Sequence, residues 1–504
     1  MLFNSYIFIF LFLPIVLLGY FLLNRTKKYQ LSNLFLIGMS LWFYGYFHPT
    51  YLYVICGSIF ANYLLSYGMN HTEKTGVRRM LLLVGIVLNV AVIFYFKYYD
   101  FFISNINAFF GSSFTLHYVV LPLGISFFTF QQLSYLVDTW HGETKDYGFL
   151  EYALFVCYFP QLIAGPIVLH KEIIPQFRDE AKRKFRSENF ARGLYIFSLG
   201  LFKKVLLADT LGRGADWGFD AIASLSGPQA FLVSLCYSFQ LYFDFSGYCD
   251  MAIGIGAMMN ITLPQNFNSP YRATSVMDFW ARWHMSLTRF LRQYIYFPLG
   301  GSRKGKARTY VNVMLVFLIS GIWHGANWTF IFWGVLHGFM QCLNRFFKKT
   351  WDKVPKAIAW LTTFLFVDLA WVLFRADSIS DGMALIRRIF SVDSWMQTFA
   401  GMKAGNAGAL ALANADGSLT EQFHLTEFQL LEGKLPVLTS ISAVIPAFYL
   451  LVLLLISFVI VLRAKNSGQL QFKPTWWRSL IAVICLVWSV MSLSGVSTFL
   501  YFNF

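Results

Sequence analysis

The feature that most constrains this chain is a succession of apolar segments, each about 18 to 22 residues long, separated by short loops that carry Lys and Arg. An α-helix needs about 20 apolar residues to cross a bilayer, whereas a transmembrane β-strand alternates apolar and polar residues over about ten. The 504 residues are 57% hydrophobic and only 13% charged, far from a soluble composition. We therefore expect an all-α polytopic membrane protein, one integral-membrane domain over residues 1–504. It should have about eleven transmembrane helices and a few broken or surface helices.

The basic loops predict how the chain is oriented, because Lys and Arg in short loops stay on the cytoplasmic side. Arg25, Lys27 and Lys28 follow the first apolar segment, so both the N-terminus and, by alternation, the C-terminus are expected outside the cytoplasm. The first segment lacks a preceding basic stretch and a following cleavage site, so we expect it to remain as a helix. Residues 376–438 form the one long hydrophilic stretch, and we expect an extracytoplasmic loop insertion there.

The net charge of +15 is explained by this topology. Basic residues dispersed between apolar segments argue against nucleic acid as a partner, which would require one charged face. The loops can still attract a phosphorylated donor such as a coenzyme A thioester, or anionic lipid headgroups. The six cysteines lie in or beside apolar segments without CxxC spacing, so we expect neither disulfides nor a metal site.

Two histidines interrupt the apolar, aromatic stretch at residues 321–338. A helix that begins near Thr309 has climbed roughly 20 Å by His324, which puts this residue near mid-membrane. Lipid-facing packing has no use for an imidazole, so a histidine at that depth indicates a functional site facing a cavity or the bundle interior. The alternative is a hydrogen bond between helices, which we favour for His337, about 220° round the same helix.

Two further stretches carry polar side chains of possible functional importance. Gln240 and Asp244 are four residues apart and share a helix face, and the acid needs a partner such as a histidine nitrogen or an arginine. His284 lies among aromatic residues and arginines that include Arg282, the pattern of an interfacial helix. It either approaches a reaction site from the cytoplasmic side or is an interfacial histidine with a hydrated tip.

Several other segments and residue pairs carry weaker signals of structure or function. Residues 119–137 are too polar for a lipid-facing helix and suit the lining of an internal channel, and residues 155–167 form a short broken segment typical of re-entrant chains. Gly334 and Gly338 are a small-xxx-small pair suited to tight helix packing. His141 and Asp146 have the HxxxxD spacing of one class of glycerolipid acyltransferase, but they lie in a hydrophilic loop and chance spacing explains them better.

Five motifs, in order along the chain, resemble the membrane-bound O-acyltransferase family, and within it the bacterial branch of alginate O-acetyltransferases and the related D-alanyl transfer protein. They are FPQLIAGP at 159–166, FDFSGY at 243–248, DFWARWH at 278–284, PLGG at 298–301 and WHGANW at 323–328. The resemblance covers nearly the whole chain. It implies a ring of helices around a thin central layer, with a cytoplasmic donor opening and an outward funnel that meet near His324. By the same match, His324 is the principal catalytic histidine and His284 the second.

The resemblance also implies substrates and partners. An acyl group, in the first instance acetyl, would pass from a cytoplasmic thioester (acetyl-CoA or an acyl carrier) toward an extracytoplasmic polysaccharide such as alginate or another cell-surface glycan, with no permanently bound cofactor. A secreted or membrane-anchored SGNH-type acyltransferase would be the partner of this multi-pass enzyme in the bacterial cytoplasmic membrane. The alternatives are D-alanyl transfer to teichoic acid, a transporter or flippase for a glycan precursor, and a non-enzymatic scaffold. We see no inverted repeats that would favour a transporter.

Acyl transfer from a thioester needs a deprotonated nucleophile and stabilisation of the developing oxyanion. Burial in an apolar centre disfavours the imidazolium, so His324 is expected to be an unprotonated base that activates the acceptor. Trp323 and Asn327 are the candidate donors to the oxyanion, and the acyl donor is expected to enter beneath Arg282 and the basic loops. Gln240 and Asp244 are the remaining candidates for substrate binding.

Overall fold

A computed structural model describes residues 1–403, 445–469, 473, 475–493 and 499–500. Every regular element within these ranges is a helix, which confirms the expected all-α class for the described part of the chain. The expected loop insertion at 376–438 begins with two helices, α19 (Ile379–Ile389) and α20 (Val392–Lys403). Residues 404–438 of that insertion lie outside the described residues.

The remaining helices fall into three groups along the chain. The first group is η1 (Phe8–Phe12), α1 (Leu13–Arg25), α2 (Tyr29–Gly45), α3 (Tyr51–Asn70), α4 (Thr75–Ile93), η2 (Phe94–Tyr98) and α5 (Tyr99–Phe110). The second is α6 (Ile125–Trp140), α7 (Phe149–Cys157), α8 (Phe159–Leu162), α9 (His170–Arg178), η3 (Glu180–Arg183), α10 (Ser187–Phe202), η4 (Lys203–Ala208), α11 (Asp209–Asp220), η5 (Ile222–Ser224) and α12 (Gly227–Met258). The third is η6 (Pro270–Arg272), α13 (Val276–Trp280), α14 (Met285–Leu291), η7 (Arg292–Tyr296), α15 (Lys306–His324), α16 (Trp328–Phe346), α17 (Lys348–Trp351), α18 (Lys356–Arg375), α24 (Ile445–Arg463), η9 (Ser467–Gln469) and α25 (Trp476–Met491).

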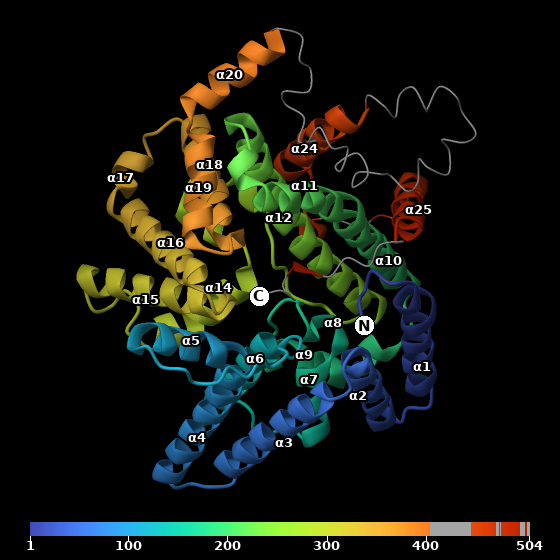
Figure 1. Ribbon diagram of the computed structural model, residues 1–504. Helices are drawn as coiled ribbons and strands as arrows, with labels where there is room; N and C mark the ends of the chain where they lie inside the picture. Colours follow the sequence, from blue (N-terminus) through green and yellow to red (C-terminus); the bar gives the residue numbers. More distant parts are fainter. Residues whose placement is uncertain (404–444, 470–472, 474, 494–498, 501–504) are drawn as a thin grey trace.

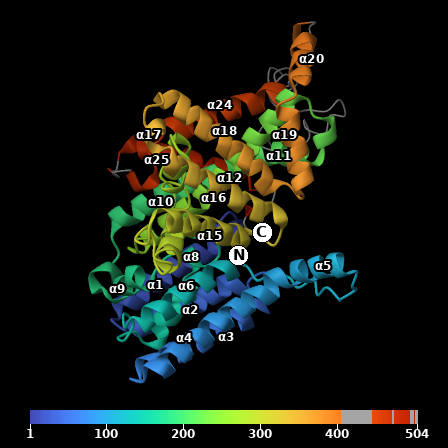
Figure 2. The same ribbon diagram turned by 90° about the vertical axis from the view of Figure 1, so that its left-hand side faces the viewer.

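Shorter helices lie between two groups of longer helices. Figure 1 shows α1–α4 on one side of the molecule and α10–α12, α18 and α24 on the other, with α6–α9 and α14 between them. After a quarter turn, α1–α4 again lie apart from α18 and α24, and α6 and α9 lie beside α1 and α2 (Figure 2). The broken segment expected at residues 155–167 belongs to these shorter helices: α7 ends at Cys157, α8 lasts four residues, and the side chains of the segment are buried. Non-helical backbone in this segment is therefore covered by protein, as a membrane-embedded chain requires.

Four helices of the described residues are long and apolar enough to cross a membrane, namely Phe8–Arg25, Tyr51–Asn70, Thr75–Phe110 and Lys356–Arg375. The total of about eleven spans stays a prediction. The four differ in burial: 17% of the most apolar window of Thr75–Phe110 is buried, against 56% for Lys356–Arg375. The first therefore presents most of its apolar surface outward, where lipid can cover it, and the second belongs to the interior of the bundle.

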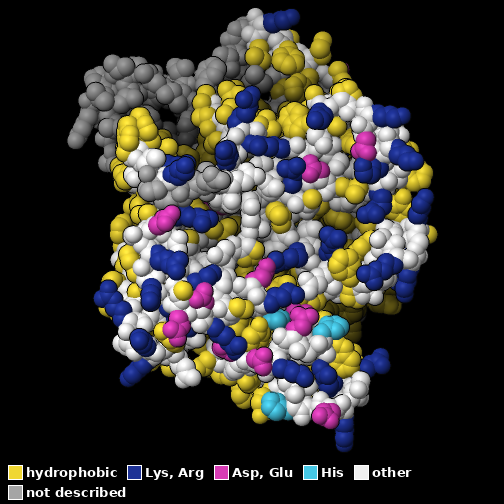
Figure 3. Space-filling view, turned by 180° about the vertical axis from the view of Figure 1, so that it is seen from behind, with side chains coloured by type: hydrophobic (Ala, Val, Ile, Leu, Met, Phe, Trp, Pro, Cys, Tyr) yellow, Lys and Arg dark blue, Asp and Glu magenta, His cyan; other side chains and the backbone are white. Residues whose placement is uncertain are grey.

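Lys and Arg side chains are scattered over the face seen in Figure 3 and do not gather into one patch. This distribution agrees with the expectation that the positive charge belongs to separate loops.

The hairpin of α15 and α16 is held together by backbone contact at two glycines. A Cβ atom built on Gly334 would lie 2.5 Å from the carbonyl oxygen of Phe317, and one built on Gly321 would lie 2.5 Å from that of Phe330. Gly338, the second member of the expected small-xxx-small pair, is less crowded, with Phe317 Cβ at 3.0 Å from its added Cβ. Because α15 ends at His324, this contact sets the distance of that histidine from α16.

Replacement of Gly334 by alanine is expected to separate the two helices, because the contact atom is a backbone carbonyl that cannot rotate away. Overpacking of this kind costs about 1–3 kcal/mol, so we expect a lower thermal unfolding midpoint of the detergent-solubilised protein and reduced activity. Gly38→Ala in α2 is the matched control, because a Cβ there meets nothing within 4 Å. Equal midpoints for the two variants would contradict the tight contact.

Candidate active site

His324 is the last residue of α15, and its side chain is 4% exposed. Carbonyl groups at the end of this helix are capped by the chain that continues α4. The Tyr98 hydroxyl donates to the Ile322 carbonyl at 2.8 Å, and the Lys97 ammonium donates to the carbonyls of Trp323 and His324 at 2.8 and 2.9 Å. A cation also complements the negative end of the helix dipole. The α4–η2 segment therefore fixes where α15 ends and where His324 lies.

Aromatic rings from three helices enclose the imidazole of His324. The ring centroids of Trp333 in α16 and Phe374 in α18 both lie 5.2 Å from it, and that of the adjacent Trp323 lies 4.9 Å from it. All three rings meet the imidazole edge to face, the geometry that aromatic pairs prefer. The imidazole is thereby held in one orientation.

One side of His324 faces a cavity of about 30 Å³. Lys97, Ile163, Trp323 and residues 121–127 complete its lining. Since one water needs about 10–15 Å³ of such cavity volume, the cavity has room for about two waters. The first part of the segment 119–137, which we expect to line an internal channel, lines this cavity, and the channel itself stays a prediction. Passages wide enough for a thioester or a glycan stay predictions.

His284 also lies beside the Trp323 indole. Its side chain is fully buried, and it precedes α14 with a left-handed backbone (φ 45°, ψ 53°). The Trp323 ring centroid is 6.1 Å from that of His284 and 4.9 Å from that of His324. Two histidines forty residues apart in the sequence are thus gathered around one tryptophan, and the interfacial, hydrated alternative for His284 does not fit its burial.

The two candidate donors to an oxyanion have other acceptors in this structure. The Trp323 indole N–H donates to the Ser126 carbonyl at 3.4 Å. The Asn327 side chain caps α16 by accepting from the Thr329 N–H at 3.1 Å, and its amide donates to the Asp377 carbonyl at 3.0 Å. Asn327 therefore organises the turn between α15 and α16, and its role toward an oxyanion stays a prediction.

Asp244 is paired with a lysine rather than with the expected histidine or arginine. The Lys204 ammonium lies 2.7 Å from the Asp244 carboxylate and 2.8 Å from that of Asp209, and the Leu500 N–H donates to Asp244 at 2.9 Å. Gln240 packs against α11, where its amide nitrogen would lie 2.5 Å from a Cβ on Gly212. Neither Gln240 nor Asp244 lines the cavity beside His324, so their geometry supports packing of α12 against η4 and α11.

Arg282 and His337 have clear local partners. The Arg282 guanidinium lies 2.7 Å from the Asp278 carboxylate, one turn earlier, and is half-buried. The Trp280 indole donates to Nδ1 of His337 at 3.1 Å, so His337 links α16 to α13. This is the hydrogen bond between helices that we favoured for His337.

One group of side chains could hold a metal ion by its composition. Asp138, Glu143 and His170 each bring a ligand atom to within 4.8 Å of the others. Asp138 already accepts from the Tyr294 hydroxyl at 2.8 Å and lies 3.0 Å from Nε2 of His170. These bonds connect α6, α9 and η7, and we interpret the cluster as a structural link.

The sequence pattern of the membrane-bound O-acyltransferase family matches residues 75–378, which include both histidines of the site. The chain is 42% identical to a peptidoglycan O-acetyltransferase of Helicobacter pylori, over 100% of this chain and 98% of that protein. It is 38% identical to a probable alginate O-acetylase of Pseudomonas aeruginosa, over 78% of this chain and 76% of that protein. It is 29% identical to a teichoic acid D-alanyltransferase of Bacillus subtilis, over 51% and 69% of the two chains.

The resemblance carried by the five motifs is thereby confirmed. The helical architecture of the described residues, the buried histidine at the end of α15 and the extended similarity lead to one conclusion: the chain belongs to the membrane-bound O-acyltransferase family and is a membrane-bound acyltransferase.

Proposed function

We propose that the protein transfers an acetyl group from a cytoplasmic thioester, acetyl-CoA in the first instance, toward an extracytoplasmic cell-wall polysaccharide. The observation that carries the proposal is His324, placed at the end of α15 against a cavity, with its ring and the ring of His284 both beside the Trp323 indole. Peptidoglycan is favoured over alginate as the polymer, because the similarity to the peptidoglycan enzyme extends over both chains from end to end.

In the proposed reaction, His324 removes the proton from an acceptor hydroxyl. The hydroxyl oxygen then forms a bond to the acetyl carbonyl carbon, the carbon–sulfur bond of the thioester breaks, and the thiolate takes up the proton. The donor approaches from the cytoplasmic side, where Arg282 and the basic loops attract its phosphates. A secreted or membrane-anchored SGNH-type acyltransferase takes the acetyl group on to the polymer, and both termini of this chain lie outside the cytoplasm.

The test uses the purified full-length protein in proteoliposomes, supplied with acetyl-CoA labelled in the acetyl group. We expect release of free coenzyme A and transfer of label to a glycan acceptor, with empty liposomes as the control. D-alanyl-loaded carrier protein is the second donor, because the teichoic acid relative makes D-alanyl transfer the competing activity. If the protein turns over the D-alanyl donor and not acetyl-CoA, the transferred group is D-alanine and the proposal of acetyl transfer is wrong. Movement of a glycan without thioester cleavage would overturn the proposal in favour of a transporter.

A further inference from the structure

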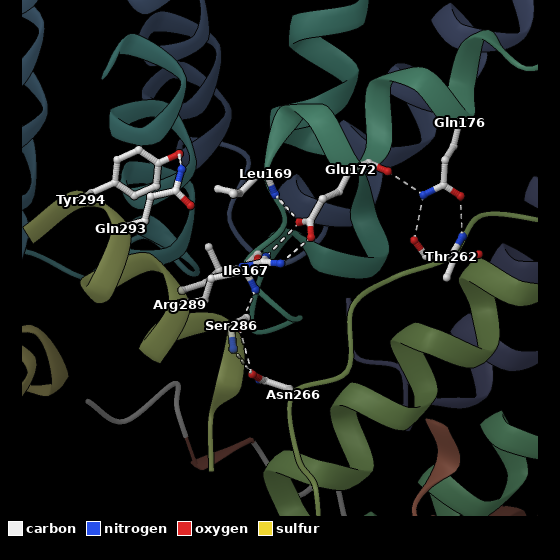
Figure 4. Close-up of polar contacts among 10 residues, drawn as sticks. All are labelled: Ile167, Leu169, Glu172, Gln176, Thr262, Asn266, Ser286, Arg289, Gln293 and Tyr294. Carbon is white, nitrogen blue, oxygen red and sulfur yellow. Dashed lines mark hydrogen bonds and ion pairs between the residues drawn. The ribbon is translucent and has the colours of Figure 1, made fainter. Parts of the chain in front are cut away.

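Asn266 lies in the non-helical segment between α12 and η6, and its side chain is 1% exposed. Its amide oxygen accepts from the backbone N–H of Ser286 at 3.1 Å and from the Ser286 hydroxyl at 2.9 Å, contacts that Figure 4 shows. The same oxygen lies 3.1 Å from Nδ1 of His284, and the Asn266 backbone carbonyl accepts from the Met285 N–H at 2.9 Å. One asparagine thus bonds to three consecutive residues at the start of α14.

These contacts decide which way the Asn266 amide points. A backbone N–H can only donate, so the amide atom that faces the Ser286 N–H must be the oxygen. If the amide were flipped, the NH2 group of Asn266 would face the Ser286 N–H, and two donors would be in contact. The amide nitrogen is directed instead to Cys249 Sγ, at 3.4 Å, where it donates to a weak acceptor.

The orientation of Asn266 decides the protonation of the His284 ring in turn. Because the Asn266 oxygen can only accept, Nδ1 of His284 must carry a hydrogen. A neutral imidazole has one N–H, so its lone pair is then on Nε2. The left-handed backbone of His284, unusual for a residue with a side chain, is held by the bonds from Met285 and Ser286 to Asn266. The ring is also fixed by Phe245, whose centroid is 4.7 Å away.

We propose that Asn266 is a positioning residue, which holds His284 in the tautomer protonated at Nδ1 and so makes Nε2 the only ring nitrogen that can take up a proton. The role in turnover rests on the proposed acetyl transfer, whereas the tautomer itself does not. A side-chain carbonyl that accepts from one ring nitrogen orients the imidazole, as hydrogen-bond acceptors orient metal-binding and catalytic histidines in other enzymes.

The first test reads the tautomer directly and needs no activity. The full-length protein, with ¹⁵N-labelled histidine rings, is placed in lipid bilayers and examined by solid-state NMR; the His284 signals are assigned by their loss in His284→Gln. We expect a protonated Nδ1 and an unprotonated Nε2, the less common tautomer of free histidine. Protonation at Nε2 in the wild-type protein overturns the proposal, whether or not any variant folds.

The second test uses three variants. Asn266→Ala is expected to lose the Nδ1–H signature and to lower kcat by about 10- to 100-fold with the KM for the donor nearly unchanged. Asn266→Asp keeps an acceptor and should keep the signature. Ser286→Ala is the matched control, since it removes a hydroxyl bond to Asn266 but leaves the backbone N–H that orients the amide. If Asn266→Ala keeps the Nδ1–H signal of His284, or keeps the wild-type kcat, Asn266 is not a positioning residue for this histidine. If the wild-type protein shows the protonated Nδ1 of His284 but does not cleave the thioester, the proposed function is contradicted and the assigned tautomer stands.

Discussion

Replacing His324 by alanine is expected to lower the rate of acetyl transfer by about 10²- to 10⁴-fold, the range typical for loss of a general base. The side chain lines the cavity and is the candidate base, while its backbone is anchored by Lys97 and by the helix contact at Gly334. The substitution therefore removes the imidazole without removing the contacts that fix the end of α15. Release of coenzyme A from labelled acetyl-CoA in proteoliposomes measures the effect.

The control for this experiment is His141→Ala. His141 is exposed on the turn after α6, so its loss should leave the rate unchanged even though it belongs to the HxxxxD spacing. Both variants must be inserted and must elute as the wild type does on gel filtration. A correctly inserted His324→Ala protein with wild-type turnover would remove His324 from the reaction.

The second large effect concerns the buried ion pair between η4 and α12. Replacing Lys204 by methionine leaves the carboxylate of Asp244 buried without its cation, since the side chains are 4% and 2% exposed. Breaking a buried pair by removing one partner costs about 3–5 kcal/mol, most of it the penalty of the charge left behind. We expect a large fall in the free energy of unfolding in mixed micelles and poor recovery of folded protein. The double variant Lys204→Met/Asp244→Leu should lose less than the two single losses added together.

Lys348→Met supplies the comparison for this prediction. Lys348 pairs with Asp352 at 2.6 Å, a distance close to that of the buried pair, but these side chains are 64% and 59% exposed. An exposed pair contributes about 0–1 kcal/mol, because water screens it and two long side chains lose freedom. If Lys348→Met and Lys204→Met destabilised the protein equally, the Lys204 site would not behave as a buried pair.

Much of the helical architecture could be predicted from local pattern. Apolar stretches of helical length are visible in a single sequence because burial in lipid acts on each segment separately. The break at residues 155–167 and the close packing at Gly334 were also recognisable, since proline and glycine act on their own backbone. His324 stood out for a local reason, as an ionisable side chain in an apolar, aromatic stretch, and His284 stood out as a histidine among aromatic residues and arginines.

Other features depended on partners distant in the chain. The acid at Asp244 was expected to need a partner, but the partner is Lys204, forty positions earlier, rather than a histidine or arginine. Lys97 follows an apolar segment in the sequence, but the carbonyls to which it donates are at the end of α15, more than two hundred residues later. Asn266 gave no signal at all, because an asparagine in an irregular segment is ordinary.

The sequence by itself determined that this chain is a helical membrane protein of the acyltransferase family, and which two histidines are the candidates for chemistry. Only the tertiary structure decided that both rings lie against Trp323, that one of them faces a cavity, and that Asn266 sets the tautomer of the other. The physical reason is the range of the forces involved. Burial and helix formation are set by neighbouring residues, whereas a hydrogen bond or an ion pair requires two groups to meet within about 3 Å, which depends on how the whole bundle packs.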